Sequence, residues 1–316
     1  MRTKEATEAL LKRLFVKFSV RGYSDKHLAY LIDTLNRQVQ AFSQLDPSLG
    51  HFIDNTLLET RKSDTAFIFG SGPSISELSP AELQEISVGD SFGFNFSLAH
   101  EMVPTHYVLQ LDKEGPYRAS MLELLRLKRD SYRKSHILVR GDHTFSGSIQ
   151  FSDLAREFLP EGRLWFLPEL AVNSQVELEP YEMMKFFEFL GLLNHGYVGR
   201  AVPKWRGTLG LVLSLTYQMG YRRIVLCGID MNDSSHFYDH RMYLGQFHGI
   251  RPPEPGLSNA KDRWMSAKYS KNTVSRYVSE FARFAYDKSG TQLFLASPGS
   301  RLQGIIPDWK FGRKGS

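Results

Sequence analysis

The chain has 316 residues, of which 42 % are hydrophobic, 13 % aromatic and 23 % charged. This composition predicts a folded globular protein with a substantial core and excludes an intrinsically disordered chain. No run of about 18 consecutive apolar residues occurs, and the charged residues 1–17 lack the apolar region of a secretory signal. The net charge of +5 is spread along the chain without clusters of basic and aromatic residues, so we expect no nucleic-acid partner.

The single cysteine, Cys227, excludes an internal disulfide and fits a reducing, cytoplasmic location. Because it stands in an apolar run, we expect a buried hydrophobic residue rather than a nucleophile. The mild positive charge would suit an anionic substrate or peripheral contact with the inner face of a membrane, and solubility alone explains it equally well.

Residues 1–62 form a predicted N-terminal helical segment. Apolar residues recur there at three-to-four-residue spacing, around Leu10–Phe18 and again around Leu28–Phe42, as on amphipathic helices. A polar stretch at 59–64 ends the segment. We expect a packing layer on the domain that follows; an appendage that binds a membrane surface or a partner is the alternative.

From residue 63 to residue 311 short apolar runs alternate with helical patterns. The predicted strands are 66–69, 92–94, 107–111, 136–139, 164–167, 223–228 and 292–296. The predicted helices are about 117–128, 150–158, 180–193, 208–219 and 272–287, with one more opening at Ser79 as N-cap and Pro80. This alternation predicts one α/β domain with a mainly parallel, Rossmann-like sheet and helices on both faces. Ligands of such sheets bind beyond the carboxyl ends of the strands.

One segment breaks the alternation. Residues 231–269 show little periodic pattern and directly follow the strand predicted at 223–228. Segments of this length without regular structure are typical of functional lids. We therefore expect a lid over the carboxyl end of the sheet.

The loop Gly70-Ser71-Gly72-Pro73-Ser74 follows the first predicted strand of this domain. Its two glycines allow the backbone to approach a ligand closely, and its N–H groups can hold an anion. It lacks the third glycine of the dinucleotide fingerprint and the Gly-Lys-Ser/Thr of a Walker loop. Spacing alone therefore leaves two interpretations open, a plain tight turn and an anion-binding loop.

Five motifs in one order resemble the bacterial sialyltransferases of glycosyltransferase family 42 and the related domain of flagellin-modifying Maf proteins. They are Phe69 with the loop 70–74, Phe94-Asn95-Phe96, Gly207-Thr208, the run 219–230 ending in Gly228-Ile229-Asp230, and Tyr269-Ser270-Lys271-Asn272-Thr273 ahead of Ala296-Ser297-Pro298-Gly299-Ser300. The resemblance covers about residues 65–305. It implies a GT-A-like, sialyltransferase-type fold with a lid.

The resemblance also implies an activity. It is the transfer of a nonulosonic or ulosonic acid, sialic-acid-like or Kdo, from a CMP-activated donor to a bacterial surface glycan or glycolipid acceptor. The CMP-sugar would be a substrate, and neither a metal nor another cofactor is expected.

The family's donor-binding roles fall on the following residues of this chain. Ser71 and Gly72 would contact phosphate and ribose, within a binding loop formed by Gly70, Ser71, Gly72, Pro73 and Ser74, although Ser71 stands where the family usually has Asn. Asn95 would bind the donor, and Asp230 would bind ribose or cytosine, an N-cap or turn role being its alternative. Gly207 and Thr208 would meet the sugar carboxylate, which suits a hydroxyl at a helix N-terminus. Ser297 and Ser300 would line the cytidine pocket.

The catalytic residues depart from the family pattern. Tyr269 stands where the family has its catalytic His, and two family Tyr positions fall near Asn232 and His236. We expect His236 to neutralise the phosphate or act as base, assisted by Tyr238 or Tyr269, because His titrates near neutral pH. The alternatives are a His that only packs within the lid, and a metal cluster of His236, Asp239 and His240.

Asp112, just past the strand predicted at 107–111, is the candidate nucleophile of a retaining, double-displacement mechanism. A helix N-cap or a solvated loop acid is its alternative. Positive charge from Lys204, Arg206, Arg241 and Lys271 would help to hold a doubly anionic donor.

Two other functions are compatible with the motifs. A pterin pyrophosphokinase-like enzyme would use ATP and Mg²⁺, with Asp112 and Asp230 holding the metal. A catalytically inactive CMP- or glycan-binding protein would keep the fold without turnover, which the replacement of the family His by Tyr269 permits.

Overall fold

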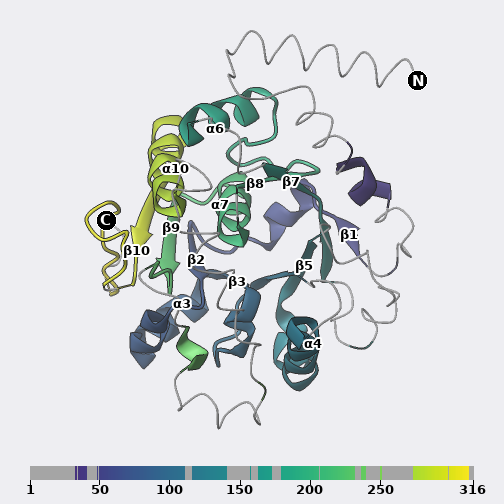
Figure 1. Ribbon diagram of the computed structural model, residues 1–316, viewed down its shortest axis with the longest axis vertical. Coiled ribbons are helices and arrows are strands. Elements are labelled where there is room, and N and C mark those ends of the chain that lie inside the picture. Colours follow the sequence, from purple (N-terminus) through teal and green to yellow (C-terminus); the bar gives the residue numbers. More distant parts are fainter. Residues whose placement is uncertain are drawn as a thin grey trace.

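A computed structural model describes residues 33, 35–40, 48, 50–110, 116–140, 157, 163–172, 179–205, 207–231, 236–239, 250, 273–297 and 299–312. Their centre is an eight-stranded sheet of order β1-β6-β5-β4-β3-β2-β9-β10, in which every neighbouring pair is parallel (Figure 1). Its strands are β1 (His51–Phe52), β2 (Thr65–Phe69), β3 (Asp90–Phe94), β4 (His106–Leu109), β5 (His136–Arg140), β6 (Leu164–Leu167), β9 (Arg223–Cys227) and β10 (Gln292–Leu295). Two further strands, β7 (Glu169–Val172) and β8 (Val202–Trp205), form a separate parallel pair.

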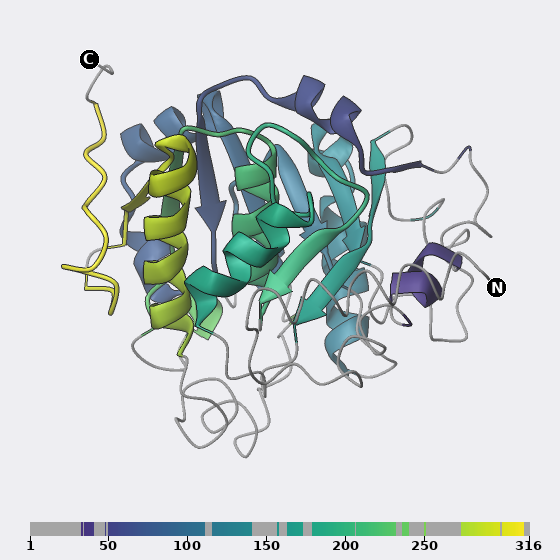
Figure 2. The same cartoon turned by 90° about the horizontal axis from the view of Figure 1, so that it is seen from above.

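Helices cover both faces of the sheet. Helices α3 (Pro80–Val88) and α4 (Pro116–Lys128) lie on one face, and α6 (Pro180–Phe189), α7 (Thr208–Gln218) and α10 (Val274–Ser289) lie on the other (Figures 1 and 2). Each face has its own apolar cluster, because the strands are buried on both sides and their side chains alternate between the faces. Short 3₁₀ helices complete the described part: η2 (Asn55–Thr60), η3 (Pro73–Glu77), η4 (Asn95–Ala99), η5 (Ser131–Lys134) and η6 (Phe237–Asp239).

Local chemistry explains where the helices begin and end. Helix α3 starts with a capping box, in which Ser79 and Glu82 satisfy each other's backbone N–H groups. Helix α10 starts at the cap Thr273 and ends at Gly290, whose left-handed backbone (φ 72°) suits glycine. None of the described helices is long and apolar enough to cross a membrane.

The predicted α/β architecture is confirmed, with a parallel sheet and helices on both faces. The prediction that residues 1–62 are helical throughout is wrong in its last part: residues 35–40 are helical, but β1 pairs with β6, and Ile53 and Leu57 lie in the core. The sheet thus includes residues before the boundary expected at 62. Helix α6 also ends earlier than the predicted residue 193.

The strands β7 and β8 are absent from the sequence prediction. Pro203 lies within β8, and proline cannot donate a ladder hydrogen bond. It is tolerated because β8 belongs to a two-stranded pair, in which each strand has an open edge. Of the expected lid, only residues 231, 236–239 and 250 belong to the described part, and most of the helix expected at 150–158 also lies outside it.

Candidate functional site

The site lies at the topological switch point of the sheet. From β2 the chain builds β3, β4 and β5 on one side, whereas β9 and β10 lie on the other. The loops that follow β2 and β9 meet at their carboxyl ends: Gly70 N–H donates to the carbonyl of Cys227 and Gly72 N–H to that of Gly228, each at 2.8 Å. Crevices at such switch points are the usual ligand sites of open α/β sheets.

Asp230 fixes the loop 70–74. Its carboxylate accepts hydrogen bonds from the backbone N–H of Ser74, at 2.9 Å, and from the Ser74 hydroxyl. A Cβ atom on Gly72 would lie 2.5 Å from the carboxylate oxygen Oδ2, so only glycine fits here. Residues 70–74 and Asp230, expected together in one donor site, are therefore in direct contact. The ribose or cytosine contact expected of Asp230 stays a prediction.

The turn after β10 holds the loop that follows β9. The hydroxyl of Ser297 accepts from the N–H of Ile229 at 3.2 Å, and the hydroxyl of Ser300 donates to the Ile229 carbonyl at 2.7 Å. Both serines are buried. Because their hydroxyls hold the loop after β9, they position this wall of the site, and contact with a cytidine stays a prediction.

Asn95 follows β3, the strand next to β2. Its backbone is left-handed (φ 51°), as is that of Met231 (φ 57°) after Asp230. These are the only two non-glycine residues with positive φ in the described part of the chain, and both stand at strand ends of the site. Strained backbone of this kind concentrates at functional sites. The turn at Asn95 is held by the Tyr107 hydroxyl, which donates to the Asn95 carbonyl.

Thr208 begins α7, with Gly207 as its N-cap. Its buried hydroxyl oxygen lies 3.4 Å from Asn95 Oδ1 and 3.3 Å from Gln110 Oε1. The positive end of the α7 dipole and the N–H groups of its first turn, which have no partner within the helix, favour an anion there. Asn95 and Thr208, two residues 113 positions apart that were assigned to one donor, thus meet in space.

A buried ionic cluster lies beside Thr208. Arg140, at the end of β5, pairs with Glu169 through Nε at 2.6 Å and Nη2 at 3.1 Å, and Lys204 of β8 binds the same carboxylate at 2.7 Å. Arg140 and Glu169 are almost fully buried. Burial alone would raise the pKa of Glu169, but the charges and hydrogen bonds of Arg140 and Lys204 outweigh it and lower that pKa to about 2. Glu169 is therefore an anion at any physiological pH.

Arg140 also contacts Thr208, one of the donor-binding candidates, and Gln110. Its Nη1 donates to Thr208 Oγ1 at 2.9 Å and to Gln110 Oε1. Gln38, on the N-terminal helix, holds Glu169 from the other side: its amide accepts from the Glu169 N–H at 2.7 Å and donates to the Glu169 carbonyl at 3.1 Å. A residue of the expected packing layer thus helps to build the site.

Gln110, Arg140 and Glu169 were not among the site residues expected from the sequence. One signal was available for Arg140, which ends an apolar strand pattern with a polar residue at the edge where ligands bind, whereas Gln110 stands inside the predicted strand 107–111. Glu169 gave no such signal, since its partner lies 29 residues away. Lys204 was expected near the site and lies there, paired with Glu169.

The catalytic candidates are only partly described. The ring of His236 stacks on that of Tyr238 at 4.8 Å between centroids, and Tyr238 contacts Phe96 at 5.8 Å. Between them, Phe237 donates its N–H to the Ser71 carbonyl at 3.0 Å. The pair therefore lies beside the loop 70–74. Asp112 and Tyr269 lie outside the described residues, as do Arg206, Arg241, Lys271 and His240.

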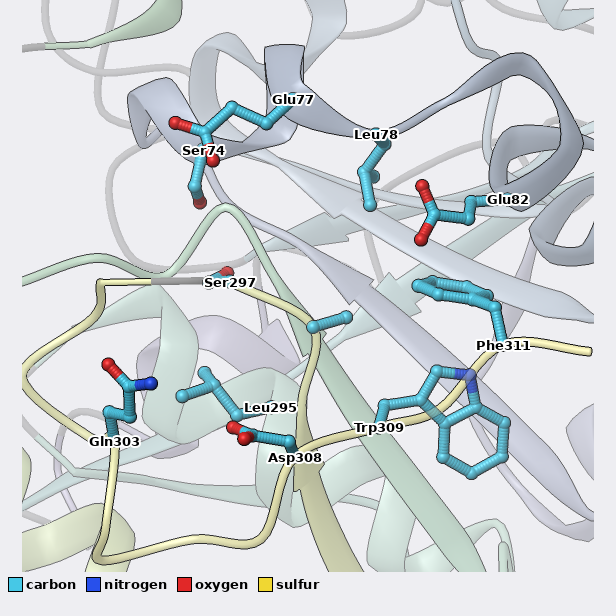
Figure 3. Close-up of a pocket in the computed structure, with 11 residues that line it drawn as sticks. Ser74, Glu77, Leu78, Glu82, Leu295, Ser297, Gln303, Asp308, Trp309 and Phe311 are labelled. Atoms are coloured by element: carbon cyan, nitrogen blue, oxygen red, sulfur yellow. The ribbon is translucent and has the colours of Figure 1, made fainter. Parts of the chain in front are cut away.

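A cavity of about 240 Å³ opens next to the loop, with Ser74 on one wall and Ser297 on another (Figure 3). Glu77, Glu82 and Asp308 place carboxylates around it, and Trp309 and Phe311 add aromatic rings (Figure 3). Its volume lies below the roughly 300–1,000 Å³ of most ligand pockets, and its carboxylates disfavour a phosphate. The cavity suits a neutral fragment with hydrogen-bond donors.

Within the described ranges, no group of three or more His, Cys, Asp or Glu side chains is placed to hold a metal ion. The side chain of Asp239 and all of His240, both named in the metal alternative, lie outside these ranges.

No family model matches this chain, and no curated protein matches it either. Among solved structures, the α-2,3/8-sialyltransferase CstII is similar over 80 % of this chain and 89 % of that one, with 12 % identity and a TM-score of 0.40. CstII from Campylobacter jejuni with the substrate analogue CMP-3FNeuAc has 15 % identity and a TM-score of 0.39, over 77 % and 86 % of the two chains. The monofunctional α-2,3-sialyltransferase Cst-I from Campylobacter jejuni has 15 % identity and a TM-score of 0.39, over 81 % and 85 %. We therefore take the function from the residues of the site and not from these similarities.

Proposed function

We propose that this protein is a glycosyltransferase that takes a sugar acid from a CMP-activated donor and transfers it to a glycan or glycolipid. The observation that carries the proposal is the meeting of residues from separate motifs along one edge of the sheet. The loop 70–74 contacts Asp230, Ser297 holds the neighbouring Ile229, and Asn95 lies against Thr208.

The residues around the loop 70–74 and those around Thr208 lie next to each other, and the two groups favour ligands of different charge. Strands β2 and β3 pair, with Phe69 opposite Gly93, and paired strands lie about 4.8 Å apart. The loop after β2 is therefore next to Asn95 and, through it, Thr208. The residues around the loop 70–74 offer a carboxylate-lined cavity and the N–H and hydroxyl of Ser71. The residues around Thr208 offer a helix N-terminus beside Arg140 and Lys204. A ligand that is neutral at one end and anionic at the other matches this order.

A CMP-linked sugar acid has that distribution of charge. The cytidine would enter the cavity beside Ser74 and Ser297, where a carboxylate can accept from the cytosine amino group. The phosphate would lie beside Ser71 and contact its N–H and hydroxyl, because the N–H groups of Gly70, Gly72 and Ser74 donate within the protein. The sugar carboxylate would then face Thr208 at the start of α7. No metal takes part in this arrangement.

His236 remains our candidate for neutralising the leaving phosphate or for acting as base, with Tyr238 or Tyr269 assisting. Its position beside Ser71, through Phe237, agrees with the first of these roles. Asp112 remains the candidate nucleophile if the transfer retains configuration.

Thermal-shift titrations distinguish this function from a pterin pyrophosphokinase-like one. We expect CMP to raise the melting temperature in EDTA, because nucleotide binding here uses N–H and hydroxyl groups and the stabilisation grows with ligand concentration. Stabilisation only by ATP with Mg²⁺ would overturn the proposal. Binding of CMP without turnover of any CMP-sugar would instead indicate the inactive CMP-binding protein.

The catalytic assignments need variants of their own. His236→Ala and Asp112→Asn should each lower the rate of CMP release from CMP-Neu5Ac or CMP-Kdo while CMP affinity is kept. Undiminished rates in both variants would refute these two assignments and leave the nucleotide site intact.

A further inference from the structure

Two arginines are buried within the described part of the chain, Arg118 and Arg140. The guanidinium of Arg140 is paired with the carboxylate of Glu169. Arg118 is only 3 % exposed, and among the described residues neither its Nε nor its Nη1 has a hydrogen-bond partner. It also belongs to none of the ion pairs that these residues form. Three of the five N–H donors of this guanidinium are therefore buried without an acceptor.

The lack of acceptors around Arg118 is unfavourable in the protein without a ligand. A buried guanidinium has lost its water, and without an acceptor it gains nothing in return. Arginine is almost never fully buried unless it is paired. A carboxylate or a phosphate would supply the missing acceptors, because the planar guanidinium binds both through two parallel N–H groups. The unpartnered donors of Arg118 thus indicate an anionic ligand.

Arg118 lies in the first turn of α4, at the carboxyl edge of the sheet. Strands β4 and β5 are parallel, so α4, which connects them, begins at the carboxyl ends of the strands and runs back toward their amino ends. Arg118 and Met121 are both buried and lie three positions apart, on the same face of α4. Side chains of a helix lean toward its N-terminus, so that of Arg118 extends toward the edge where ligands bind.

The turn of α4 that follows Arg118 contacts the turn at Asn95. The sulfur of Met121 lies 3.5 Å from the hydroxyl of Tyr107, and that hydroxyl donates to the Asn95 carbonyl. Because Arg118 stands one turn closer to the start of α4 than Met121, its side chain lies beyond this contact, on the carboxyl side of Asn95.

A row of aromatic rings connects the start of α4 to the catalytic candidates. Tyr117, next to Arg118, packs edge-on against Phe96 at 4.8 Å between centroids, and Phe96 contacts Tyr238 at 5.8 Å. The ring of Tyr238 stacks on that of His236. The first turn of α4 therefore lies at the same crevice as these residues, on the face of the sheet opposite α7 (Figures 1 and 2).

We propose that Arg118 and the first turn of α4 form a second anion site, which binds a carboxylate or phosphate group of a ligand in this crevice. The N–H groups of that turn have no partner within the helix, and the dipole of the 13-residue helix adds to the positive charge of Arg118. The site is distinct from the one at Thr208, because α4 and α7 cover opposite faces of the sheet. Two sources of the anion fit, the phosphate of a CMP-linked donor and an acidic group of the acceptor.

Inorganic phosphate is the probe, and the readout is the melting temperature of the full-length protein at constant ionic strength. Phosphate should stabilise the wild type, and Arg118→Met should need about ten times more phosphate for the same gain, the usual effect of losing hydrogen bonds to a charged group. Arg126→Met is the matched control: it removes an exposed arginine of the same helix, paired with Glu157, and should respond like the wild type. The control also accounts for the general stabilisation that phosphate gives to folded proteins. Equal responses of Arg118→Met and the wild type overturn the proposal.

Arg118→Lys covers the case in which Arg118→Met does not fold. It keeps the positive charge but loses the paired N–H groups, so phosphate should still stabilise it, at several times the concentration that the wild type needs. A purely structural role of Arg118 would leave the phosphate dependence unchanged. A phosphate dependence of Arg118→Lys equal to that of the wild type would therefore overturn the proposal.

Calorimetry with CMP and with cytidine distinguishes the two sources of the anion. If Arg118 binds the donor phosphate, Arg118→Met loses affinity for CMP and keeps it for cytidine. If it binds an acidic group of the acceptor, CMP affinity is unchanged, and phosphate still stabilises the wild type saturated with CMP. The anion site does not rest on the function proposed above. A protein that binds no CMP, but whose phosphate response is lost in Arg118→Met, would refute that function and leave this site intact.

Discussion

Replacing Gly72 by alanine is the most severe test of the nucleotide-binding role proposed for the loop 70–74. The new Cβ would lie 2.5 Å from Asp230 Oδ2 and 2.8 Å from the Gly228 carbonyl, whereas ordinary contact begins at 3.4 Å, so the loop or Asp230 must move by about 0.9 Å. Overpacking of this kind costs about 1–3 kcal/mol. Movement of Asp230 also weakens its two bonds to Ser74, and a misplacement of about 1 Å can reduce the function of a site about a hundredfold.

We therefore expect Gly72→Ala to fold, to melt a few degrees lower, and to bind CMP about ten- to a hundredfold more weakly by calorimetry. Gly199→Ala is the control, because its Cβ would meet no atom closer than 3.9 Å and its backbone is not left-handed. The reasoning is refuted if Gly72→Ala binds CMP within about twofold of the wild type while Gly199→Ala behaves identically.

Three further predictions concern stability and the loop. Burial, and then the charge of Lys128, lower the pKa of His100 to about 4. Between pH 6.5 and 4 the unfolded chain therefore binds a proton that the folded chain does not. The urea midpoint of unfolding should fall as the pH drops through this range, and it should fall less steeply in His100→Gln. Ser79→Ala removes the α3 cap and should cost about 1 kcal/mol in urea unfolding, with the urea dependence unchanged. Asp230→Asn should weaken CMP binding more than Ser74→Ala, because the serine variant keeps the backbone hydrogen bond; the reverse order in calorimetry would contradict the role of Asp230.

Much of the fold could be predicted because its signals are local. The strands β2 and β9 are continuous apolar runs ended by glycine, as strands buried on both faces are, and their parallel pairing follows from the helices between them. The N-cap of α3 at Ser79 can likewise be predicted from the local sequence. By contrast, β1 is two residues long and exists only because β6 offers it an edge, so no pattern within the sequence marks it.

The residues of the candidate site differ in the same way, because some are marked by local sequence signals and others only by tertiary contacts. The loop 70–74, Asn95, Thr208 and Asp230 stand at strand ends or helix starts, where position alone draws attention to them. The ion pair between Arg140 and Glu169 is a tertiary contact, and buried charges are rare enough that neither residue would be placed in a core from its type. Its connection to Thr208 becomes visible only when β5, β7 and α7 are brought together.

The central claim is that the site binds and cleaves a CMP-linked sugar acid without a metal. The most direct measurement is release of CMP from CMP-Neu5Ac and CMP-Kdo by the purified protein in EDTA, followed by chromatography with and without a glycan acceptor. The account predicts CMP release from at least one donor, undiminished by EDTA and strongly reduced in Gly72→Ala. Release that requires Mg²⁺, or no release from either donor by a protein that binds CMP, would contradict it.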